Sequence, residues 1–303
     1  MKKAYFQLIL TFAFVASAYA GKNKQGVFEL IIPGGAELTI DANAGGRITS
    51  LAIHDTELLT NKDVHAENYG STFWTSPQND WGWPPFKEID NKAYKVLESS
   101  DTSLVLNSKP GKSGFGLRKH FEVNRQDSCL SITYTISNIA NKELKVAPWE
   151  VTRVWPGGLS FCEKGHEIVI NEHGMGITDT LGCIWVNYDS ATISGAQKLY
   201  VDGKGWLAHV NHDVLFLKTF KDIHPEKAAP DEQEVELFLS GALSYIELEN
   251  QGEYTILKPG SSHSWVVTWY VRKINKQDIA IGSTLLKHVE DLMNKQMIAE
   301  KNK

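Results

Sequence analysis

Short runs of β-branched and aromatic residues follow one another along the chain after residue 26, separated by turns rich in Gly, Asn, Asp and Pro. Several runs alternate strictly, as in Cys129 to Ile136, where every second residue is apolar and shares one face. Turn signals at such regular spacing are typical of an all-β sandwich or barrel. We expect strands at Val27 to Ile32, Ala36 to Ile40, Arg47 to Ile53, Ser103 to Asn107, Gly116 to Val123, Cys129 to Ile136, Glu143 to Val154, Glu167 to Ile170, Cys183 to Asn187, Lys198 to Val201, Trp206 to Val210, Val214 to Phe220, Glu234 to Ser240, Tyr245 to Asn250, Tyr254 to Leu257 and Ser264 to Val271.

Helical spacing of apolar residues occurs in one segment near the C-terminus. The recurring residues are Ile279, Ile281, Leu285, Leu286, Val289, Leu292 and Met293. This pattern predicts one amphipathic helix that packs against the sheets. The segment from His224 to Glu234 contains two prolines and predicts a long surface loop. No repeat or linker divides the chain, so we expect a single domain over residues 21–303.

Residues 1–20 have the features of a secretory signal peptide. Lys2 and Lys3 form a positive start, an apolar stretch follows to Ala16, and Ala18-Tyr19-Ala20 is a small-x-small cleavage site. The apolar stretch is too short to span a bilayer, which takes roughly 20 apolar residues. We therefore expect export to a periplasm or the outside of the cell, cleavage near Ala20 and no membrane anchor.

Charge and composition narrow the range of partners. The 31 basic and 36 acidic residues give a net charge of −5, and removal of Lys2 and Lys3 with the signal peptide gives −7. Basic residues are dispersed among acidic ones, which argues against nucleic acid and favours a neutral or cationic ligand. No sequence feature indicates a protein partner or a cofactor.

The cysteines and histidines do not form a recognisable metal site. Three cysteines without C-x-x-C spacing indicate neither zinc nor a disulfide scaffold, although Cys162 and Cys183 are one conceivable pair. None of the ten histidines forms an H-x-H or H-x-x-x-H pattern, and His212 and His263 are the best placed for chemistry. Nucleophile-elbow, P-loop and dinucleotide motifs are missing from the sequence.

The strongest local anomaly is the segment Asn68 to Pro85, NYGSTFWTSPQNDWGWPP. It places Trp74, Trp81 and Trp83 beside Gln78 in a region that reads as a loop because of its Gly, Pro, Ser and Asn content. Exposed rings beside amides and carboxylates suit a sugar, whose C–H faces stack on rings while its hydroxyls form hydrogen bonds. The alternative is a loop whose tryptophans fold back and close one end of the sandwich.

Two predicted strands carry charge. In APWEVTRVWPGG, Trp149 and Arg153 point to one side and Glu150 to the other, so a charge faces each side and must be paired or reach a cleft. Arg153 either meets an anionic group of a ligand or orients Glu150. In the stretch from Leu243, Glu247 and Glu249 share one strand face with Tyr245, where they form either a solvated strip or a source of a general base.

Taken together, these segments resemble the galactose mutarotase-like superfamily, in particular a bacterial branch of it related to aldose 1-epimerases. The resemblance covers most of the chain beyond residue 20 and is carried by AGGRITSL, STFWTSPQNDWGWPP, GLRKHFEV, LSITYTISNIANKELKVAPWEVTRV and YIELENQGEYTILKPGSSHSWVVTWYV. It implies a β supersandwich of two large twisted antiparallel sheets, with a sugar bound in a cleft on one concave face.

The resemblance also implies a chemistry. Aldose epimerases open and reclose a pyranose ring with a carboxylate base and a histidine acid. By position the base is Glu247, with Glu249 second. The sequence departs from the family where its histidine motif N-H-x-Y-F-N-L should occur, because APWEVTRV places Trp149 and Glu150 there. His212 is the substitute if the fold brings it to the cleft.

Three functions follow from these expectations. The first is an exported aldose 1-epimerase-like enzyme with catalytic Glu247, Glu150 and His212 and with substrate-binding Trp74, Gln78, Trp81, Trp83, Trp149, Arg153 and Glu249. The second is a binding module that has lost catalysis, which the missing histidine motif would explain. The third uses Glu150 and Glu247 as paired carboxylates in glycoside cleavage, which needs them roughly 5–9.5 Å apart across the cleft.

Overall fold

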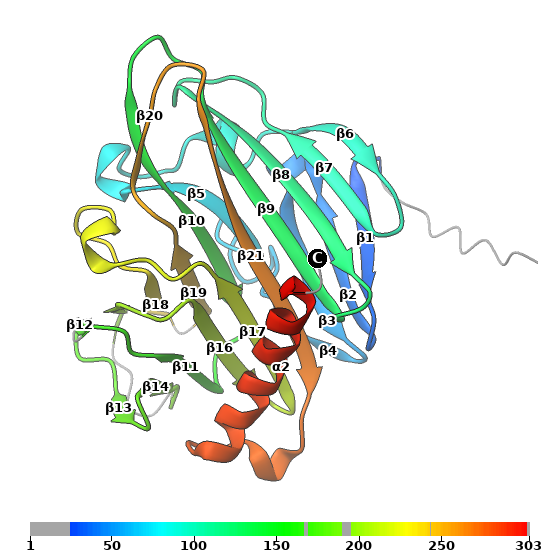
Figure 1. The fold of residues 1–303 in the computed structure, drawn as a ribbon, viewed down its shortest axis with the longest axis vertical. Coiled ribbons are helices and arrows are strands. Elements are labelled where there is room, and N and C mark those ends of the chain that lie inside the picture. The colour runs from blue at the N-terminus through cyan, green and yellow to red at the C-terminus, as the bar shows by residue number, and fades with distance from the viewer. Residues whose placement is uncertain (1–24, 167–168, 190–194, 243, 302–303) are drawn as a thin grey trace, which may run out of the picture.

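A computed structural model describes residues 25–166, 169–189, 195–242 and 244–301, so the predicted signal peptide lies outside the described residues. Two antiparallel sheets make up the fold (Figure 1). The first sheet has the order β1 (Val27–Ile32), β2 (Ala36–Asp41), β3 (Arg47–Ile53), β5 (Ser71–Ser76), β10 (Leu144–Val154), β19 (Ile246–Gln251), β18 (Val235–Leu239), β15 (Gln197–Val201) and β12 (Val169–Glu172), with β4 (Thr56–Glu57) on β3 and β20 (Thr255–Leu257) on β10.

The second sheet lies against the first. Its order is β13 (Ile177–Thr180), β14 (Cys183–Asn187), β11 (Leu159–Glu163), β16 (Trp206–Asn211), β17 (Val214–Phe220), β21 (Ser262–Lys273), β9 (Cys129–Asn138), β8 (Phe115–Asn124), β7 (Ser103–Asn107) and β6 (Lys95–Ser99). The α-helices of the described residues are a short one, α1 (Lys87–Asp90), and the C-terminal α2 (Ser283–Lys301). This all-β architecture with one long C-terminal helix confirms the predicted fold class.

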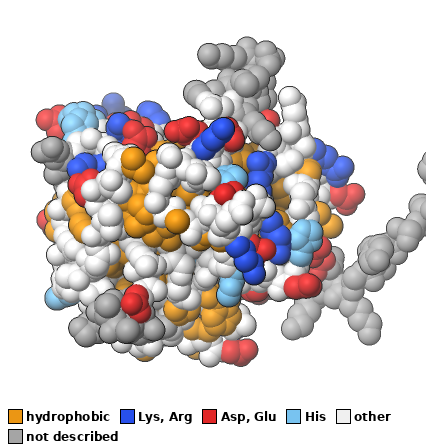
Figure 2. Space-filling view, turned by 90° about the horizontal axis from the view of Figure 1, so that it is seen from below, with side chains coloured by type: hydrophobic (Ala, Val, Ile, Leu, Met, Phe, Trp, Pro, Cys, Tyr) orange, Lys and Arg blue, Asp and Glu red, His pale blue; other side chains and the backbone are white. Residues whose placement is uncertain are grey.

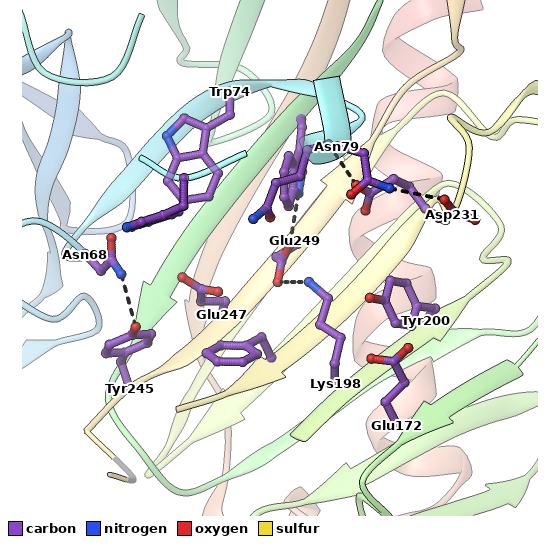
Figure 3. Close-up of a pocket in the computed structure, with 15 residues that line it drawn as sticks. Asn68, Trp74, Asn79, Glu172, Lys198, Tyr200, Asp231, Tyr245, Glu247 and Glu249 are labelled. Carbon is purple, nitrogen blue, oxygen red and sulfur yellow. Dashed lines mark hydrogen bonds and ion pairs between the residues drawn. The ribbon is translucent and has the colours of Figure 1, made fainter. Parts of the chain in front are cut away.

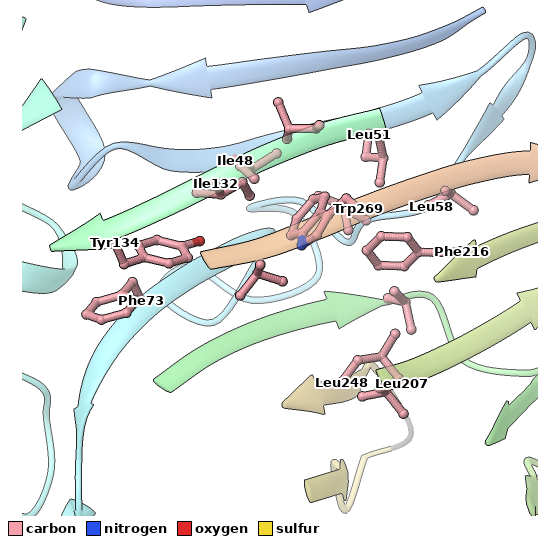
Figure 4. Packing of buried hydrophobic residues seen from close by; sticks show 14 of the residues in the cluster. Ile48, Leu51, Leu58, Phe73, Ile132, Tyr134, Leu207, Phe216, Leu248 and Trp269 are labelled. Atoms are coloured by element: carbon pink, nitrogen blue, oxygen red, sulfur yellow. The ribbon is translucent and has the colours of Figure 1, made fainter. Parts of the chain in front are cut away.

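The main hydrophobic core lies between the two sheets (Figure 4). Alternation along each strand directs one set of side chains inward, so that Leu248 of β19 packs in the same cluster as Phe216 of β17 and Trp269 of β21. Phe73 of β5 stacks on Tyr134 of β9, with ring centroids 4.3 Å apart. Because these apolar side chains pack between the sheets, the opposite face of the first sheet is directed outward.

Helix α2 covers the other face of the second sheet. Leu285, Val289 and Leu292 are buried in a second cluster together with Leu217 of β17 and Tyr270 of β21. The helix begins at Ser283, later than the apolar period suggested, because Ile279 and Ile281 precede it in an irregular segment. No helix in the described part of the chain is long and apolar enough to cross a membrane.

One segment that the sequence favoured as a loop is partly a strand. Ser71–Ser76 forms β5, which is buried throughout and pairs with β10, with Trp74 opposite Trp149. The prediction of a loop over the whole of Asn68 to Pro85 was therefore wrong for its first half. Lack of alternation explains the error, because STFWTS has both faces covered and so shows no apolar and polar period.

Cys162 and Cys183 form no disulfide. They lie on adjacent strands but in different hydrophobic clusters, Cys162 toward the core between the sheets and Cys183 toward helix α2. Side chains on opposite faces of a sheet cannot bridge. On the face of the molecule shown in Figure 2, basic and acidic side chains are interspersed, with no continuous basic tract on that face.

Candidate functional site

A cavity of about 500 Å³ lies on the face of the first sheet that is directed away from the core (Figure 3). Its floor is formed by β10, β19, β18, β15 and β12, and its rim by the segments around Gln78 and Asp231. Its lining combines rings, amides and charges, namely Trp74, Trp83, Trp149, Tyr200, Phe238, Tyr245, Asn68, Gln78, Asn79, Glu172, Asp231, Glu232, Glu247, Glu249 and Lys198.

Strand register places five residues in one row on this face of the sheet, and four of them line the cavity. Arg153 pairs with Glu247, Glu247 with Phe238, Phe238 with Lys198, and Lys198 with Glu172. Directly opposed residues point to the same face of a sheet. Across five neighbouring strands the row therefore reads cation, anion, aromatic ring, cation and anion. These residues lie far apart in the sequence.

Glu247 is held from behind by a buried cation. Arg153 donates its Nε to Glu247 Oε1 at 2.8 Å and its Nη1 to Thr72 Oγ1 at 3.1 Å. The Arg153 side chain is fully buried, whereas that of Glu247 is 12% exposed and lines the cavity. The guanidinium also lies 5.0 Å from the ring centroid of Trp74. Glu247 is thus a cavity carboxylate whose orientation is fixed by Arg153.

Lys198 shows the reverse arrangement, a cation backed by buried carboxylates. Its Nζ lies 2.8 Å from Glu236 Oε2 and 2.5 Å from Glu249 Oε1. Trp149 Nε1 donates to Glu249 Oε2 at 2.9 Å, which fixes that carboxyl group as well. The Lys198 side chain is 16% exposed, while those of Glu236 and Glu249 are almost completely buried.

The pKa values in this cluster are shifted. Burial raises the pKa of Glu249 to about 8, against the opposing effect of Lys198, and burial likewise raises the pKa of Glu236 to about 8. Burial alone would lower the pKa of Lys198, but Glu236 and Glu249 together raise it well above its ordinary value. These buried contacts favour the ammonium form of Lys198.

Trp74, Trp149 and Trp83 form a tryptophan wall along the cavity. Trp74 and Trp149 are buried in the sheet, whereas Trp83 is exposed. Trp74 Nε1 donates to Asp90 Oδ1 at 2.8 Å, and its ring meets that of Trp149 edge to face with centroids 5.3 Å apart. Trp83 lies edge to face with Trp74 at 5.9 Å and is 54% exposed. An exposed ring beside buried ones offers an apolar surface to a ligand.

Two loops meet at the rim of the cavity. Glu232 accepts a hydrogen bond from the backbone N–H of Gln78 at 3.1 Å, and Asp231 accepts one from Asn79 Nδ2 at 3.2 Å. At the other end, Asn68 Nδ2 donates to the hydroxyl of Tyr245 at 3.3 Å. These contacts keep amide and hydroxyl groups beside the rings of the cavity.

Of the residues that sequence reasoning selected, Trp74, Gln78, Trp83, Trp149, Glu247 and Glu249 line this cavity. Trp81 packs against Trp74 and Trp149 but lines a different, smaller cavity of about 300 Å³. Its indole nitrogen donates to the carbonyl of Thr75 at 2.7 Å. Trp81 supports the tryptophan wall from the side away from the cavity.

Glu150 and Arg153 do not occupy the positions expected for them. Glu150 is completely buried between the sheets, 2.9 Å from Lys218 Nζ, with hydrogen bonds from Tyr134 at 2.6 Å and Trp269 at 3.0 Å. Glu150 therefore faces the core and not the cavity, because alternation on β10 directs it opposite to Trp149. Arg153 orients Glu247 and not Glu150, and it does not line the cavity.

His212 lies in the turn between β16 and β17, exposed and with a positive φ of 54°. It does not line the cavity, so the fold does not bring it to Glu247. None of the described residues that line the cavity is a histidine. Within the described ranges, no group of three or more His, Cys, Asp or Glu side chains is placed to hold a metal ion.

Lys198 is the main residue that sequence reasoning missed, together with Tyr200, Phe238 and Glu172. A signal was present, because KLYV alternates polar and apolar residues, which puts Lys198 and Tyr200 on one face and Leu199 and Val201 on the other. The partners of that face could not be known without the order of strands, since β15 pairs with β18 and not with β19.

In the comparison with protein families, the model of the domain of unknown function DUF4380 matches residues 56–272. The comparison with curated proteins gives no match. Among solved structures, a galactose mutarotase-like protein from Lactobacillus casei matches with a TM-score of 0.58 and 13% identity over 82% of this chain and 100% of that chain. A galactose mutarotase related enzyme from Lactobacillus acidophilus matches with a TM-score of 0.57 and 9% identity over 82% of this chain and 98% of that chain.

A provisionally assigned aldose 1-epimerase from Escherichia coli K12 has a TM-score of 0.56 and 12% identity, and the match covers 82% of this chain and 99% of the other. At these identities the likeness concerns the fold alone. It confirms the galactose mutarotase-like supersandwich expected from the sequence.

Proposed function

The chain belongs to the DUF4380 family and has a galactose mutarotase-like fold, and from this premise we propose that its cavity binds a sugar and acts as an aldose 1-epimerase-like isomerase. The observation that carries the proposal is one carboxylate, Glu247, that reaches an aromatic cavity and is fixed from behind by Arg153. We also propose that the protein is exported, with cleavage of residues 1–20, and that it works in a periplasm or outside the cell.

The cavity suits a pyranose in size and in chemistry. A volume of about 500 Å³ falls in the range of about 300–1,000 Å³ that small-molecule sites occupy. Trp83 and Phe238 offer rings to the C–H face of a sugar, while Asn68, Gln78 and Asn79 offer amide groups to its hydroxyls. Both kinds of contact are available within one cavity.

Glu247 is the base in this proposal. It removes the proton of the anomeric hydroxyl while the ring C–O bond breaks, and it returns a proton after rotation of the open chain. Arg153 keeps the carboxyl group aimed at the cavity, and Thr72 keeps Arg153 in place. Glu249 binds Lys198 and Trp149 and so belongs to the wall that receives the ligand.

The test combines binding and turnover. Tryptophan fluorescence of the purified chain is titrated with neutral aldoses, and mutarotation of the same sugars is followed by polarimetry. Glu247→Gln should lower the rate about 100-fold or more, the usual range for a general base, and keep most of the binding. Glu226→Gln is the matched control, since Glu226 is a surface carboxylate whose side chain is 87% exposed. Equal rates in Glu247→Gln and the control would refute the assignment.

A binding module on the same fold is the second candidate. The observation in its favour is that no described residue lining the cavity is a histidine. It predicts saturable fluorescence changes without faster mutarotation. Glycoside cleavage by Glu150 and Glu247 is not retained, because Glu150 is buried in the core on the opposite face of the sheet and cannot flank a bond in the cavity.

A further inference from the structure

We propose that Lys198 is the proton donor of this site and acts across Phe238 from Glu247. The inference rests on the proposed epimerase-like function and supplies the acid that it lacks. Lys198 is the one basic residue among the described residues that line the cavity. Glu247 and Lys198 are also both reachable, with side chains 12% and 16% exposed, whereas their counterions are buried.

The strand register sets the two groups on either side of one ring. Glu247 is opposite Phe238 on β18, and Phe238 is opposite Lys198 on β15. Neighbouring strands lie about 4.8 Å apart, so the two backbones are separated by about 10 Å. Phe238 is the floor between them. A sugar whose anomeric carbon lies over Phe238 therefore has Glu247 on the side of its anomeric hydroxyl and Lys198 on the side of its ring oxygen.

The surroundings of Lys198 hold the ammonium in place. Two carboxyl groups contact it, Glu236 at 2.8 Å and Glu249 at 2.5 Å. The Nζ also lies 5.5 to 6.0 Å from the ring centroids of Tyr200, Trp149 and Phe238. Contacts of both kinds favour a cation. Lys198 is thus a positioned, charged donor with a third N–H available to a ligand.

Ring opening of the sugar needs no reactant besides Glu247 and Lys198. Glu247 takes the proton from the anomeric hydroxyl, the electron pair of that O–H bond forms the C=O bond, and the bond from C1 to the ring oxygen breaks. The ring oxygen receives its proton from Lys198, which becomes a neutral amine. An alkoxide is a far stronger base than an amine, so this transfer runs downhill in spite of the high pKa of Lys198. After rotation about C1–C2 the same steps in reverse close the ring as the other anomer.

Two variants separate proton donation from charge alone. Lys198→Met removes both the proton and the charge. Lys198→Arg keeps the charge and its attraction to Glu236 and Glu249, but a guanidinium gives up its proton very poorly. The same purified protein is measured by tryptophan fluorescence for binding of neutral aldoses and by polarimetry for mutarotation, with circular dichroism as the check on folding.

We expect Lys198→Met to lose about 100-fold or more in mutarotation rate. Lys198→Arg should bind within about tenfold of the unaltered protein and still fail to restore the rate, and this variant decides the question if Lys198→Met does not fold. A rate within threefold of the unaltered protein in either folded variant would overturn the assignment of Lys198. Binding by the unaltered protein without any acceleration would also overturn it and leave the binding module. No binding of any sugar would refute the proposed function itself.

Discussion

Arg153 donates its Nε to Glu247 Oε1 at 2.8 Å from a fully buried position, while Glu247 reaches the cavity. The two partners are therefore unequal. Loss of Glu247 leaves a cation inside the protein, whereas loss of Arg153 leaves an anion that water in the cavity can still solvate. A buried charge without its partner costs about 3–5 kcal/mol, and a partly solvated one costs less.

We predict that Glu247→Leu lowers the free energy of unfolding more than Arg153→Leu does. The double variant should cost less than the sum of the two single ones, because the removal of both partners leaves no unpaired charge. Urea denaturation of the three variants measures this. A simple sum, or a larger loss in Arg153→Leu, would show that the pair does not have the burial described.

The core ion pair of Glu150 and Lys218 leads to a different expectation. Both side chains are completely buried, and they join β10 of the first sheet to β17 of the second. Glu150→Gln should cost about 3–5 kcal/mol in unfolding free energy and leave sugar affinity unchanged in the folded protein. Urea denaturation together with a fluorescence titration tests both statements. If Glu150→Gln is as stable as the unaltered protein but binds sugar more weakly, Glu150 contacts the ligand and the core assignment is wrong.

Strand alternation predicted most of the fold and part of the site. It indicated that Trp149 and Glu150 point to opposite faces and that Glu247 and Glu249 share one. Alternation could not predict which face of β10 is covered by the second sheet. Lys218, the partner of Glu150, belongs to a strand of that sheet. The cavity row depends on the strand order β10, β19, β18, β15, which no local pattern encodes.

Replacement of Trp83 tests the tryptophan wall without disturbing the fold. It is 54% exposed and contacts Trp74 only at an edge. Trp83→Ala should weaken sugar binding about 3- to 10-fold, which corresponds to a ring contact of about 0.5–1.5 kcal/mol. The free energy of unfolding should change by no more than about 0.5 kcal/mol.

Trp149→Ala is the contrasting variant. Trp149 is 3% exposed and also fixes Glu249 through its indole N–H, so its truncation should destabilise the protein by about 3–5 kcal/mol. Thermal or urea denaturation of both variants measures the difference. Equal stability losses in the two variants would contradict the assignment of Trp83 to the surface of the cavity.

His209 makes the free energy of unfolding depend on pH. It is buried on β16, with Ser160 Oγ 2.8 Å from its Nδ1, and burial lowers its pKa to about 3 from an ordinary value of 6.5. The unfolded chain thus binds a proton below pH 6.5 that the folded one does not. The stabilisation is complete above pH 6.5 and is lost as the pH falls toward about 3.

We predict that His209→Gln flattens this dependence between pH 6 and pH 4. The slope of unfolding free energy against pH should decrease by about 1.4 kcal/mol per pH unit, the value for one proton. Urea denaturation over this pH range provides the measurement, at pH values where the unaltered protein is still folded. An unchanged slope would show that His209 is protonated or exposed in the folded protein.

The proposed function requires that the cavity over β19, β18 and β15 binds a sugar. The most direct test is a titration of tryptophan fluorescence with neutral aldoses and with the corresponding uronic acids. We predict a saturable change with a neutral aldose that weakens in Trp83→Ala. Uronic acids should bind more weakly, because five carboxyl groups and one lysine of the described residues line the cavity. No saturable change with any of the sugars would contradict it.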